Sequence, residues 1–315
     1  MNKILLSICI PTYNRADYLK NSIESIIYQE EFINKKVEIV IADNASSDNT
    51  EDIARSYANQ YDNIIYYKNK NNINNDNFPY VLSKGNGILR RLCNDTLCFK
   101  DGALKYICDI VIKYEQTKPF ICWLGAKEIP EIEEMSFRNG IKAASYWITA
   151  IACFSIWEDE CNNLETDTYG AELMLWQVRK TLELSSAKDN VLLINKVLTF
   201  TQTVYKKNIS YGLYHVFFEN YFKLLNPYFE NGKLLEEDKN YLEKDLLLNF
   251  FPDWCAKWKL QNTNLQYSKT EDLCVNIYKE YHMKPYWIEY KRKFFRIYWR
   301  LKIKSFINKI FGRGQ

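Results

Sequence analysis

"SICIPTYNRADYLKNSIESI", residues 7–26, contains an apolar run, a proline-containing polar turn and a helical pattern in direct succession. The apolar run, which begins earlier as "ILLSICI", is typical of a buried strand. The helical pattern covers about residues 16–30. Because a buried strand that leads directly into a helix is the first half of a βαβ unit, this stretch predicts an α/β fold.

The same alternation continues along the chain. The apolar runs "VEIVIA", "IIYY" and "GILRRLC" predict three more strands, and residues 50–61 have a second helical pattern. The Asn/Lys-rich segment "KNKNNINNDN" is expected to be a loop between the third strand and the next helix. Strands that alternate with helices favour a Rossmann-like, mainly parallel sheet with flanking helices.

Length and charge divide the chain. With 315 residues, of which 47% are hydrophobic, it can form one large α/β domain and an appendage. The net charge is +3, but residues 284–313 contain ten Lys or Arg against the single Glu289, which gives +9 there and 3 − 9 = −6 elsewhere. We expect an α/β domain over residues 1–205, a helical region over 206–283 and a basic amphipathic helix over 284–315.

The cysteines and the apolar segments of the sequence indicate the cellular compartment in which the protein works. None of the nine cysteines forms a C-x-x-C pair, and several lie among apolar neighbours, so zinc binding and a disulfide framework are not expected. The first apolar run is short and breaks at Pro11, unlike a signal peptide. No apolar stretch approaches the roughly 20 residues that cross a bilayer. These features predict a cytoplasmic protein without a transmembrane helix.

Polar segments follow three of the predicted strands. "PTYNR" follows the first, "ADNASSDNT" the second and "CNDT" the fourth. Any one of them could be an ordinary turn or helix cap, and for Asp48 the capping role is at least as plausible as a ligand contact. Because ligands bind beyond the carboxyl ends of parallel strands, the three together predict a binding site at one edge of the sheet.

The order and spacing of these blocks resemble a known family. "SICIPTYNRADYLKNSIESI", "EIVIADNASSDNTEDIA" (38–54), "NNINNDNF" (71–78) and "NDTLCFKDGAL" (94–104) together resemble the N-terminal region of family-2 glycosyltransferases, over roughly the first 110 residues. The resemblance implies the GT-A fold and is closest to the bacterial branch that builds O-antigen or capsular polysaccharide.

The resemblance also implies a nucleotide-sugar site. Pro11, Thr12 and Tyr13 would shape the nucleotide pocket, and Asp43 would accept hydrogen bonds from the base or ribose. A run of asparagines replaces the glycine usual in the loop before Asn77, which predicts a looser backbone there. The nucleotide-sugar contacts implied in this way are those of Pro11, Thr12, Tyr13, Arg15, Asp43, Asn77, Arg91, Asn94 and Asp95.

"NDT", residues 94–96, occupies the position of the family's metal-binding acidic motif. Asp95 is the remaining carboxylate, because the other acidic positions fall on Cys93 and Asn94. One carboxylate, the donor phosphates and water can together hold Mg²⁺ or Mn²⁺, so a divalent cation is expected. In the alternative, Arg90 or Arg91 neutralises the diphosphate in place of the metal, although an arginine at the edge of the fold is about as plausible.

The reaction implied is inverting transfer of a sugar from a nucleotide diphosphate to a hydroxyl of a lipid-linked saccharide. Such a transfer needs a general base, and a carboxylate is the natural choice because both histidines lie in the C-terminal half. We expect the base just before a helix that starts near Tyr169, with Asp167 as the first candidate and Glu172 as the second. A solvated acidic loop is the alternative for most carboxylates of this segment.

The C-terminal tail has the pattern of an interfacial helix. The basic residues Arg292, Arg296, Arg300 and Lys304 form one stripe, and the apolar residues Trp287, Tyr290, Phe294, Ile297, Tyr298 and Leu301 form another face. This pattern predicts peripheral binding to the inner face of the cell membrane, near a lipid-linked acceptor. A helix packed on the catalytic domain or within a dimer is the competing interpretation.

Two other functional classes compete with this interpretation. The reduced acidic motif would suit a module of the same fold that has lost turnover and only binds a nucleotide, a glycan or an assembly partner. Binding of nucleic acid through the basic tail has little support, because no folded recognition motif accompanies it.

Overall fold

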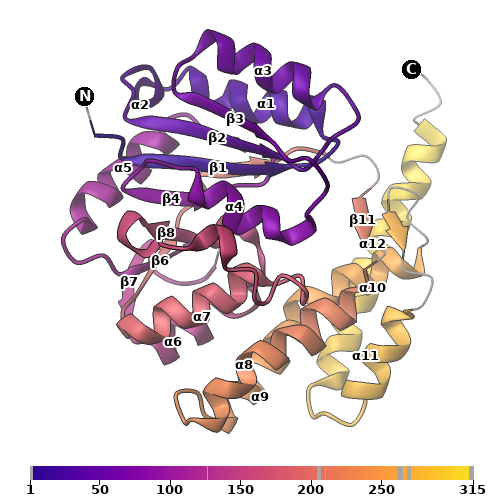
Figure 1. The fold of residues 1–315 in the computed structure, drawn as a ribbon. Helices are drawn as coiled ribbons and strands as arrows, with labels where there is room; N and C mark the ends of the chain where they lie inside the picture. The colour runs from indigo at the N-terminus through magenta and orange to yellow at the C-terminus, as the bar shows by residue number, and fades with distance from the viewer. Residues whose placement is uncertain are drawn as a thin grey trace. The chain divides into compact units, whose positions relative to one another are not determined.

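The computed structural model describes residues 3–125, 127–203, 207–209, 211–260, 265–267 and 271–311. The chain divides into two compact units, Met1–Thr203 and Val204–Gln315. Each unit is described by itself (Figure 1).

The first unit contains strands and helices in alternation. Its strands are β1 Leu6–Thr12, β2 Val37–Asp43, β3 Ile64–Lys68, β4 Leu89–Leu92, β5 Leu97–Phe99, β6 Phe120–Leu124, β7 Ile132–Met135, β8 Ser155–Trp157, β9 Val191–Asn195 and β10 Thr199–Thr201. Its α-helices are α1 Ala16–Ile27, α2 Glu30–Ile33, α3 Thr50–Gln60, α4 Asn77–Ser83, α5 Ala103–Tyr114, α6 Phe137–Ala144 and α7 Trp176–Lys188. Short 3₁₀ turns lie between them at Asn74–Asp76, Ser145–Thr149, Ile151–Cys153, Glu158–Glu160 and Leu164–Thr166.

Five strands form the main sheet, in the order β3-β2-β1-β4-β8. The first four are parallel, and only β8 runs antiparallel to its neighbour β4. The register pairs Thr12 at the end of β1 with Asp43 at the end of β2. The loops that follow β1 and β2 therefore start side by side at one edge of the sheet.

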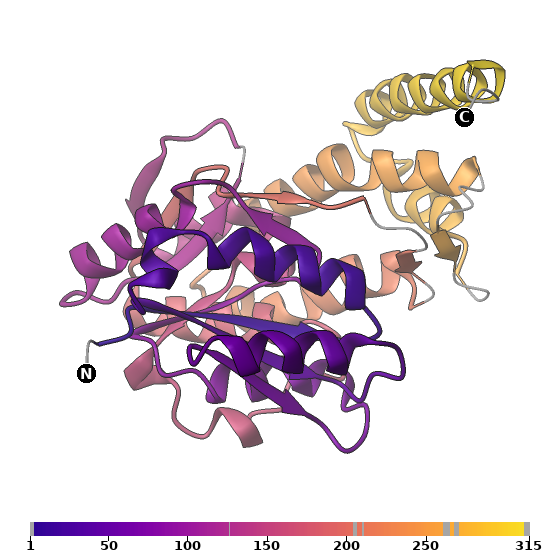
Figure 2. The same ribbon diagram turned by 90° about the horizontal axis from the view of Figure 1, so that it is seen from above.

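Helices cover both faces of this sheet, which explains its apolar strands. Every residue of β2 is buried, as expected for a parallel strand covered on both faces. Figures 1 and 2 show α1 and α3 next to one another over one face, where α1 buries Leu19, Ile23 and Ile26. α4 packs against β1, β2 and β4. The expected α/β fold with a mainly parallel sheet is confirmed.

Two smaller sheets complete the unit. β6, β9 and β7 form a three-stranded sheet in the order β6-β9-β7, and β10 pairs antiparallel with β5. An isolated bridge between Cys122 and Phe154 links β6 to the segment before β8. The 167–175 segment, which contains both predicted base candidates, lies between β8 and α7.

The helix expected near Tyr169 begins later, at Trp176. Two residues before it have left-handed backbone conformations, Gly170 with φ +90° and Met174 with φ 60°. Such residues interrupt a right-handed helix. Residues 167–175 are therefore a series of turns, held by hydrogen bonds such as that from the Ala171 N–H to the Thr168 carbonyl.

The second unit is mainly helical, as expected. Its α-helices are α8 Tyr221–Glu230, α9 Glu236–Asp245, α10 Phe251–Lys259, α11 Leu273–Tyr281 and α12 Trp287–Phe311, with π-helical turns at His215–Asn220 and Leu246–Phe250. The short strands β11 Lys207–Ile209 and β12 Leu265–Tyr267 pair in parallel. Figure 2 shows α12, in yellow, as one long uninterrupted helix. Within the described part of the chain, no helix combines the length and apolar character that crossing a membrane requires.

Candidate functional site

A cleft of about 680 Å³ lies beyond the carboxyl ends of β1 and β2. Three segments surround it: the turn after β1, the asparagine-rich loop before α4 and the turns before α7. Its lining residues are Pro11, Thr12, Tyr13, Asn44, Asn72, Ile73, Asn74, Asn75, Asp76, Asn77, Phe78, Thr168, Ala171, Glu172 and Met174. A cleft at this position is where ligands of open α/β sheets bind.

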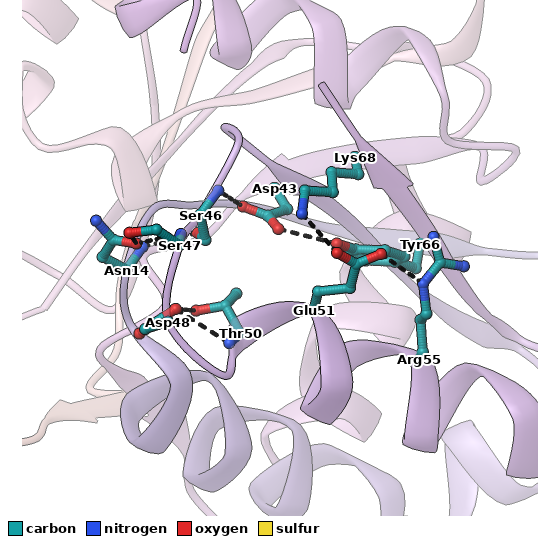
Figure 3. A network of polar contacts seen from close by, with 10 residues as sticks. All are labelled: Asn14, Asp43, Ser46, Ser47, Asp48, Thr50, Glu51, Arg55, Tyr66 and Lys68. Carbon is teal, nitrogen blue, oxygen red and sulfur yellow. Dashed lines mark hydrogen bonds and ion pairs between the residues drawn. The ribbon is translucent and has the colours of Figure 1, made fainter. Parts of the chain in front are cut away.

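The loops after β1 and β2 are tied to each other by hydrogen bonds (Figure 3). The backbone N–H of Asn14 donates to the Ser46 hydroxyl at 2.8 Å, and the N–H of Ser47 donates to the Asn14 side-chain oxygen at 2.8 Å. Asn14 has a φ of 52°, a left-handed conformation that asparagine adopts more readily than most residues. The two blocks that carry the family resemblance thus form one structural unit.

Asp48 holds the start of two helices. Its carboxylate accepts hydrogen bonds from the N–H of Thr50, at 3.0 Å, and from the N–H of Ala16, at 3.3 Å. These are the first residues of α3 and α1. Burial raises the pKa of Asp48, but these hydrogen bonds outweigh it and bring the pKa below its usual value. The capping role of Asp48 explains its position without a ligand.

Asp43 lies behind the cleft. Its side chain is 0% exposed. One carboxylate oxygen accepts the Ser46 N–H at 2.9 Å and the other accepts the Tyr66 hydroxyl at 2.8 Å. Burial and the Asp43 carboxylate together raise the pKa of Tyr66. The structure therefore does not bring Asp43 to the cleft, and the next residue, Asn44, lines it instead.

Asn44 fixes the asparagine-rich loop. Its amide nitrogen donates to the Asn72 side-chain oxygen at 2.8 Å, and its own oxygen accepts the Ile73 N–H at 2.8 Å. Asn69 donates to both Asn44, at 3.2 Å, and Asn77, at 2.9 Å. The prediction of a looser backbone is therefore wrong, because side-chain amides make the links that a glycine could not.

Asp95 faces the end of β1 from the end of β4. The Thr12 hydroxyl donates to its carboxylate at 2.9 Å. Burial raises the pKa of Asp95 to about 6, although the nearby Arg15 charge and the Thr12 hydrogen bond oppose that shift. Burial also raises the pKa of the neighbouring Cys93 thiol to about 12, so Cys93 is neutral. Asp95 is the single charged group of the "CNDT" segment, as predicted from the sequence.

The two arginines of β4 do not enter the cleft. Arg90 donates to the Leu82 carbonyl, at 2.8 Å, at the end of α4. Arg91 is 5% exposed, donates to the Ala152 carbonyl at 3.1 Å and lies 4.7 Å from the centre of the Trp123 ring. Both side chains are used inside the fold. The predicted contact of Arg91 with the donor, and the alternative in which an arginine replaces the metal, do not agree with this placement.

The two base candidates have different environments. The Asp167 carboxylate forms ion pairs with Arg179 and, at 3.1 Å, with Lys180. It is not among the cleft-lining residues. Glu172 lines the cleft and accepts the Gly170 N–H at 2.8 Å. Of the two candidates, Glu172 is the one that lines the cleft.

The described lining of the cleft is acidic. It includes Asp76 and Glu172 but no lysine or arginine. Burial and the charge of Glu172 raise the pKa of Asp76. A diphosphate in such a cleft would need positive charge from elsewhere. Among the described residues, Arg15 lies close enough to Asp95 to lower its pKa and is one source of such charge; a bound divalent cation would be another.

The side chains near Asp95 suit a cation that takes most of its ligands from the nucleotide and water and few from the protein. Among the described residues, no group of three or more His, Cys, Asp or Glu side chains could hold a metal ion alone. Asp95, with Thr12 beside it, provides one carboxylate at the sheet edge. Mg²⁺ and Mn²⁺ accept such an arrangement when phosphate oxygens and water supply the other ligands.

The structure groups some of the predicted residues and separates others. Pro11, Thr12, Tyr13, Asn77 and Glu172 line the cleft, with Asp95 bound to Thr12. The residues that do not line it are Arg15, Asp43, Arg91, Asn94 and Asp167. The sequence reasoning missed Asn44, Asn72, Asp76, Thr168 and Met174. For Asn44 and Asp76 a signal existed, since Asn44 lies in the polar block after the second strand and Asp76 lies in "NNINNDNF", a block of the family resemblance.

Comparison with known proteins agrees with this geometry. Residues 7–75 match the family described as Glycosyl transferase family 2. An abequosyltransferase, RfbV of Salmonella typhimurium, is 46% identical over 86 residues, which is 27% of this chain and 26% of that protein. The minor teichoic acid biosynthesis protein GgaA of Bacillus subtilis is 38% identical over 61 residues, 19% of this chain and 14% of that protein. The chain thus matches about a quarter or less of the length of these relatives.

Solved structures extend the similarity of fold along the chain. The mannosyltransferase PcManGT of Pyrobaculum calidifontis, in complex with GDP-Man and Mn²⁺, superposes with a TM-score of 0.52 at 12% identity, over 99% of this chain and 89% of that one. Residues 1–349 of S. aureus TarS, in complex with UDP-GlcNAc, give 0.52 at 13% identity, over 93% and 89%. Residues 7–75 therefore match glycosyl transferase family 2 in sequence. The chain has the fold of the GT-A glycosyltransferases.

Proposed function

We propose that this chain is an inverting glycosyltransferase that moves a sugar from a nucleotide-diphosphate donor to a hydroxyl group. The observation that carries the proposal is the cleft at the ends of β1 and β2, where the two family-matching loops are bonded together. The turn Pro11–Tyr13 and the asparagine-rich loop would hold the nucleotide. Amide side chains suit this role because they can both donate to and accept from a base or a ribose.

Glu172 is the group that we propose as the general base. It lines the cleft, within electrostatic range of Asp76 in the asparagine-rich loop. A base must reach the acceptor hydroxyl as it attacks the anomeric carbon, and a cleft-lining carboxylate can do so. Asp167, which is paired with Arg179 and Lys180, would instead anchor the turns that carry Glu172.

Asp95 is the proposed ligand of a divalent cation. When bound, Mg²⁺ or Mn²⁺ would stabilise the negative charge of the departing diphosphate. Thr12 orients the Asp95 carboxylate through its hydroxyl. The raised pKa of Asp95, about 6, still leaves it ionised at neutral pH and able to bind a cation.

The acceptor that we propose is a lipid-linked saccharide of bacterial surface polysaccharide, used at the inner face of the cell membrane. One relative is named for teichoic acid biosynthesis and another for abequosyl transfer, and both names are compatible with O-antigen or capsule assembly. The basic C-terminal helix is compatible with work at a membrane.

The proposal is tested by turnover with a panel of nucleotide sugars, read as release of the nucleotide. Glu172→Gln should lower kcat by roughly 10² to 10⁴ at saturating donor and acceptor. Glu165→Gln is a matched control, because Glu165 lies in the same segment and pairs with Lys84 at the surface. A Glu172→Gln variant with unchanged kcat would exclude Glu172 as the base.

The same experiment separates an enzyme from a binding module. A module of this fold would show a rise in melting temperature with a nucleotide diphosphate but no release of nucleotide from any sugar donor. A protein that neither binds a nucleotide nor turns one over would refute the proposal as a whole.

A further inference from the structure

The helix α12 has two apolar faces, and the one predicted from the sequence faces the protein. Tyr290 is only 5% exposed, and Phe294, Ile297, Tyr298 and Leu301 are half-buried. α12 packs along α10 within the second unit. This face therefore already has a partner, and the prediction that it enters a membrane is wrong.

A different apolar stripe lies on the outer side of the helix. Its residues, Ile288, Phe295, Trp299, Ile303 and Phe306, are 60%, 52%, 53%, 55% and 64% exposed. At about 100° per residue they fall within roughly 80° of one another. Tyr290 and Leu301 lie on the opposite side of the helix by the same geometry. We call these five residues the outer stripe.

Cations border the outer stripe on both sides. Lys291 and Lys302 lie along one edge, and Arg296 and Arg300 follow the other. Arg292 lies within the stripe, between Ile288 and Phe295. The Lys302 ammonium lies 4.8 Å from the centre of the Trp299 ring. The helix contains eight Lys or Arg and the single acid Glu289, so its net charge is 8 − 1 = +7.

We propose that the outer stripe docks on the surface of an anionic lipid bilayer. Rings and aliphatic groups would enter the boundary between headgroups and acyl chains, while the bordering cations meet the lipid phosphates. A second copy of the chain would bring the same +7 helix against itself, and like charges would oppose that contact. A nucleic acid would satisfy the cations but leave the rings exposed. An anionic bilayer satisfies both.

The outer stripe is the surface that would bring the enzyme to its lipid-linked acceptor. In this respect the inference rests on the proposed function, which names that acceptor. The chemistry of the stripe itself depends only on α12. A negative result for vesicle binding can therefore be distinguished from a negative result for sugar transfer.

The test is co-sedimentation of the full-length protein with vesicles of phosphatidylcholine alone and of phosphatidylcholine and phosphatidylglycerol in equal parts. We expect binding to the mixed vesicles and little to the neutral ones. Arg296→Gln with Arg300→Gln should weaken binding about 25-fold, since each cation near an anionic surface contributes about a fivefold factor. Phe295→Ser with Trp299→Ser should weaken it at least about tenfold.

Ile112→Ser is the matched control, because Ile112 is 57% exposed on a helix of the first unit. It should leave vesicle binding unchanged. Circular dichroism should be the same for all variants, since the altered side chains are exposed.

The inference is overturned if the Phe295→Ser/Trp299→Ser variant binds mixed vesicles like the wild type. It is equally overturned if the wild type does not bind the mixed vesicles. If sedimentation velocity then shows that the same variant turns a dimer into a monomer, the stripe is a self-association surface instead. Nucleotide release from a sugar donor, measured on the same preparations, reports on the proposed function separately.

Discussion

Three aspartates follow the strands of the main sheet, and each has a different environment. Asp43 is enclosed by Ser46 and Tyr66, Asp48 binds the starts of two helices, and Asp95 receives the Thr12 hydroxyl. Only Asp95 both adjoins the cleft and has a pKa raised by burial, to about 6. At the scale of single residues, some aspartates of the segments that resemble the family therefore hold the fold together, whereas Asp95 lies beside the cleft.

Asp43→Asn should act on stability first. The change removes the charge that strengthens the hydrogen bonds from Ser46 and Tyr66, and we expect a loss of about 1–3 kcal/mol in the free energy of unfolding. Tyr66→Phe should cost about 1 kcal/mol. Urea denaturation measures both, with the exposed Asp62→Asn as the control. An unchanged denaturation midpoint together with a large rise in donor KM would instead place Asp43 in contact with the donor.

Glu172→Gln should stabilise the free protein at neutral pH. Burial and Glu172 raise the pKa of Asp76 above 3.8, so the folded protein keeps the Asp76 proton to a higher pH than the unfolded chain does. The resulting loss of stability is absent well below pH 3.8, where both states are protonated, and it grows as pH rises from the unfolded-state pKa to the folded-state pKa. Removing the Glu172 charge should recover up to about 1 kcal/mol at pH 7 and little at pH 3.5.

Urea denaturation of Glu172→Gln and the wild type at the two pH values measures this gain. Glu165→Gln, which removes a surface carboxylate paired with Lys84, should show no gain. A gain of the same size at pH 3.5 and pH 7 would mean that it does not arise from Asp76.

At the scale of elements, side chains of the following helix hold the turns of residues 167–175, and Arg179 makes several of these contacts. Arg179, at the second turn of α7, pairs with Asp167 and donates to the Tyr169 carbonyl at 3.0 Å. Its stem lies against Gly170, where an added Cβ would come within 3.2 Å of the Arg179 Cβ. Arg179 is therefore a positioning residue for the wall that carries Glu172.

Arg179→Met should keep the packing of the stem and lose the ion pairs and the hydrogen bond. We expect kcat to fall by roughly 10- to 100-fold, because a small displacement of the base is costly, while the donor Kd changes little. Arg179→Lys should restore part of kcat, since a lysine can still pair with Asp167. Steady-state kinetics and donor titration measure the two effects. If kcat and donor affinity fell together, the side chain would support the whole cleft rather than this wall.

Periodicity predicted the strands and helices that surround the cleft, but it could not predict which way each side chain points at a strand end. Asp43 and Asn44 are adjacent, and only Asn44 lines the cleft, because successive side chains point to opposite sides. The sequence also could not predict that both arginines of β4 point into the fold, where each donates a hydrogen bond to a backbone carbonyl. The start of α7 was misplaced because left-handed residues such as Met174 carry no clear sequence pattern.

At the scale of the whole molecule, every described residue of the cleft belongs to the first unit. The family match covers residues 7–75, whereas the similarity of fold to PcManGT covers 99% of the chain. Chemistry at the cleft and docking through α12 are therefore carried by different units. The proposed function requires that the cleft bind a nucleoside diphosphate together with a cation.

Calorimetric titration of nucleoside diphosphates, with and without Mn²⁺, into the wild type and Asp95→Asn tests that claim most directly. Because the described lining of the cleft contains no lysine or arginine, the wild type should bind a nucleotide at least about tenfold more tightly with Mn²⁺. The nucleotide should raise the affinity for Mn²⁺ by the same factor. Asp95→Asn should lose this coupling while its fold persists. Equal affinity with Mn²⁺ and with EDTA, in both proteins, would contradict the account.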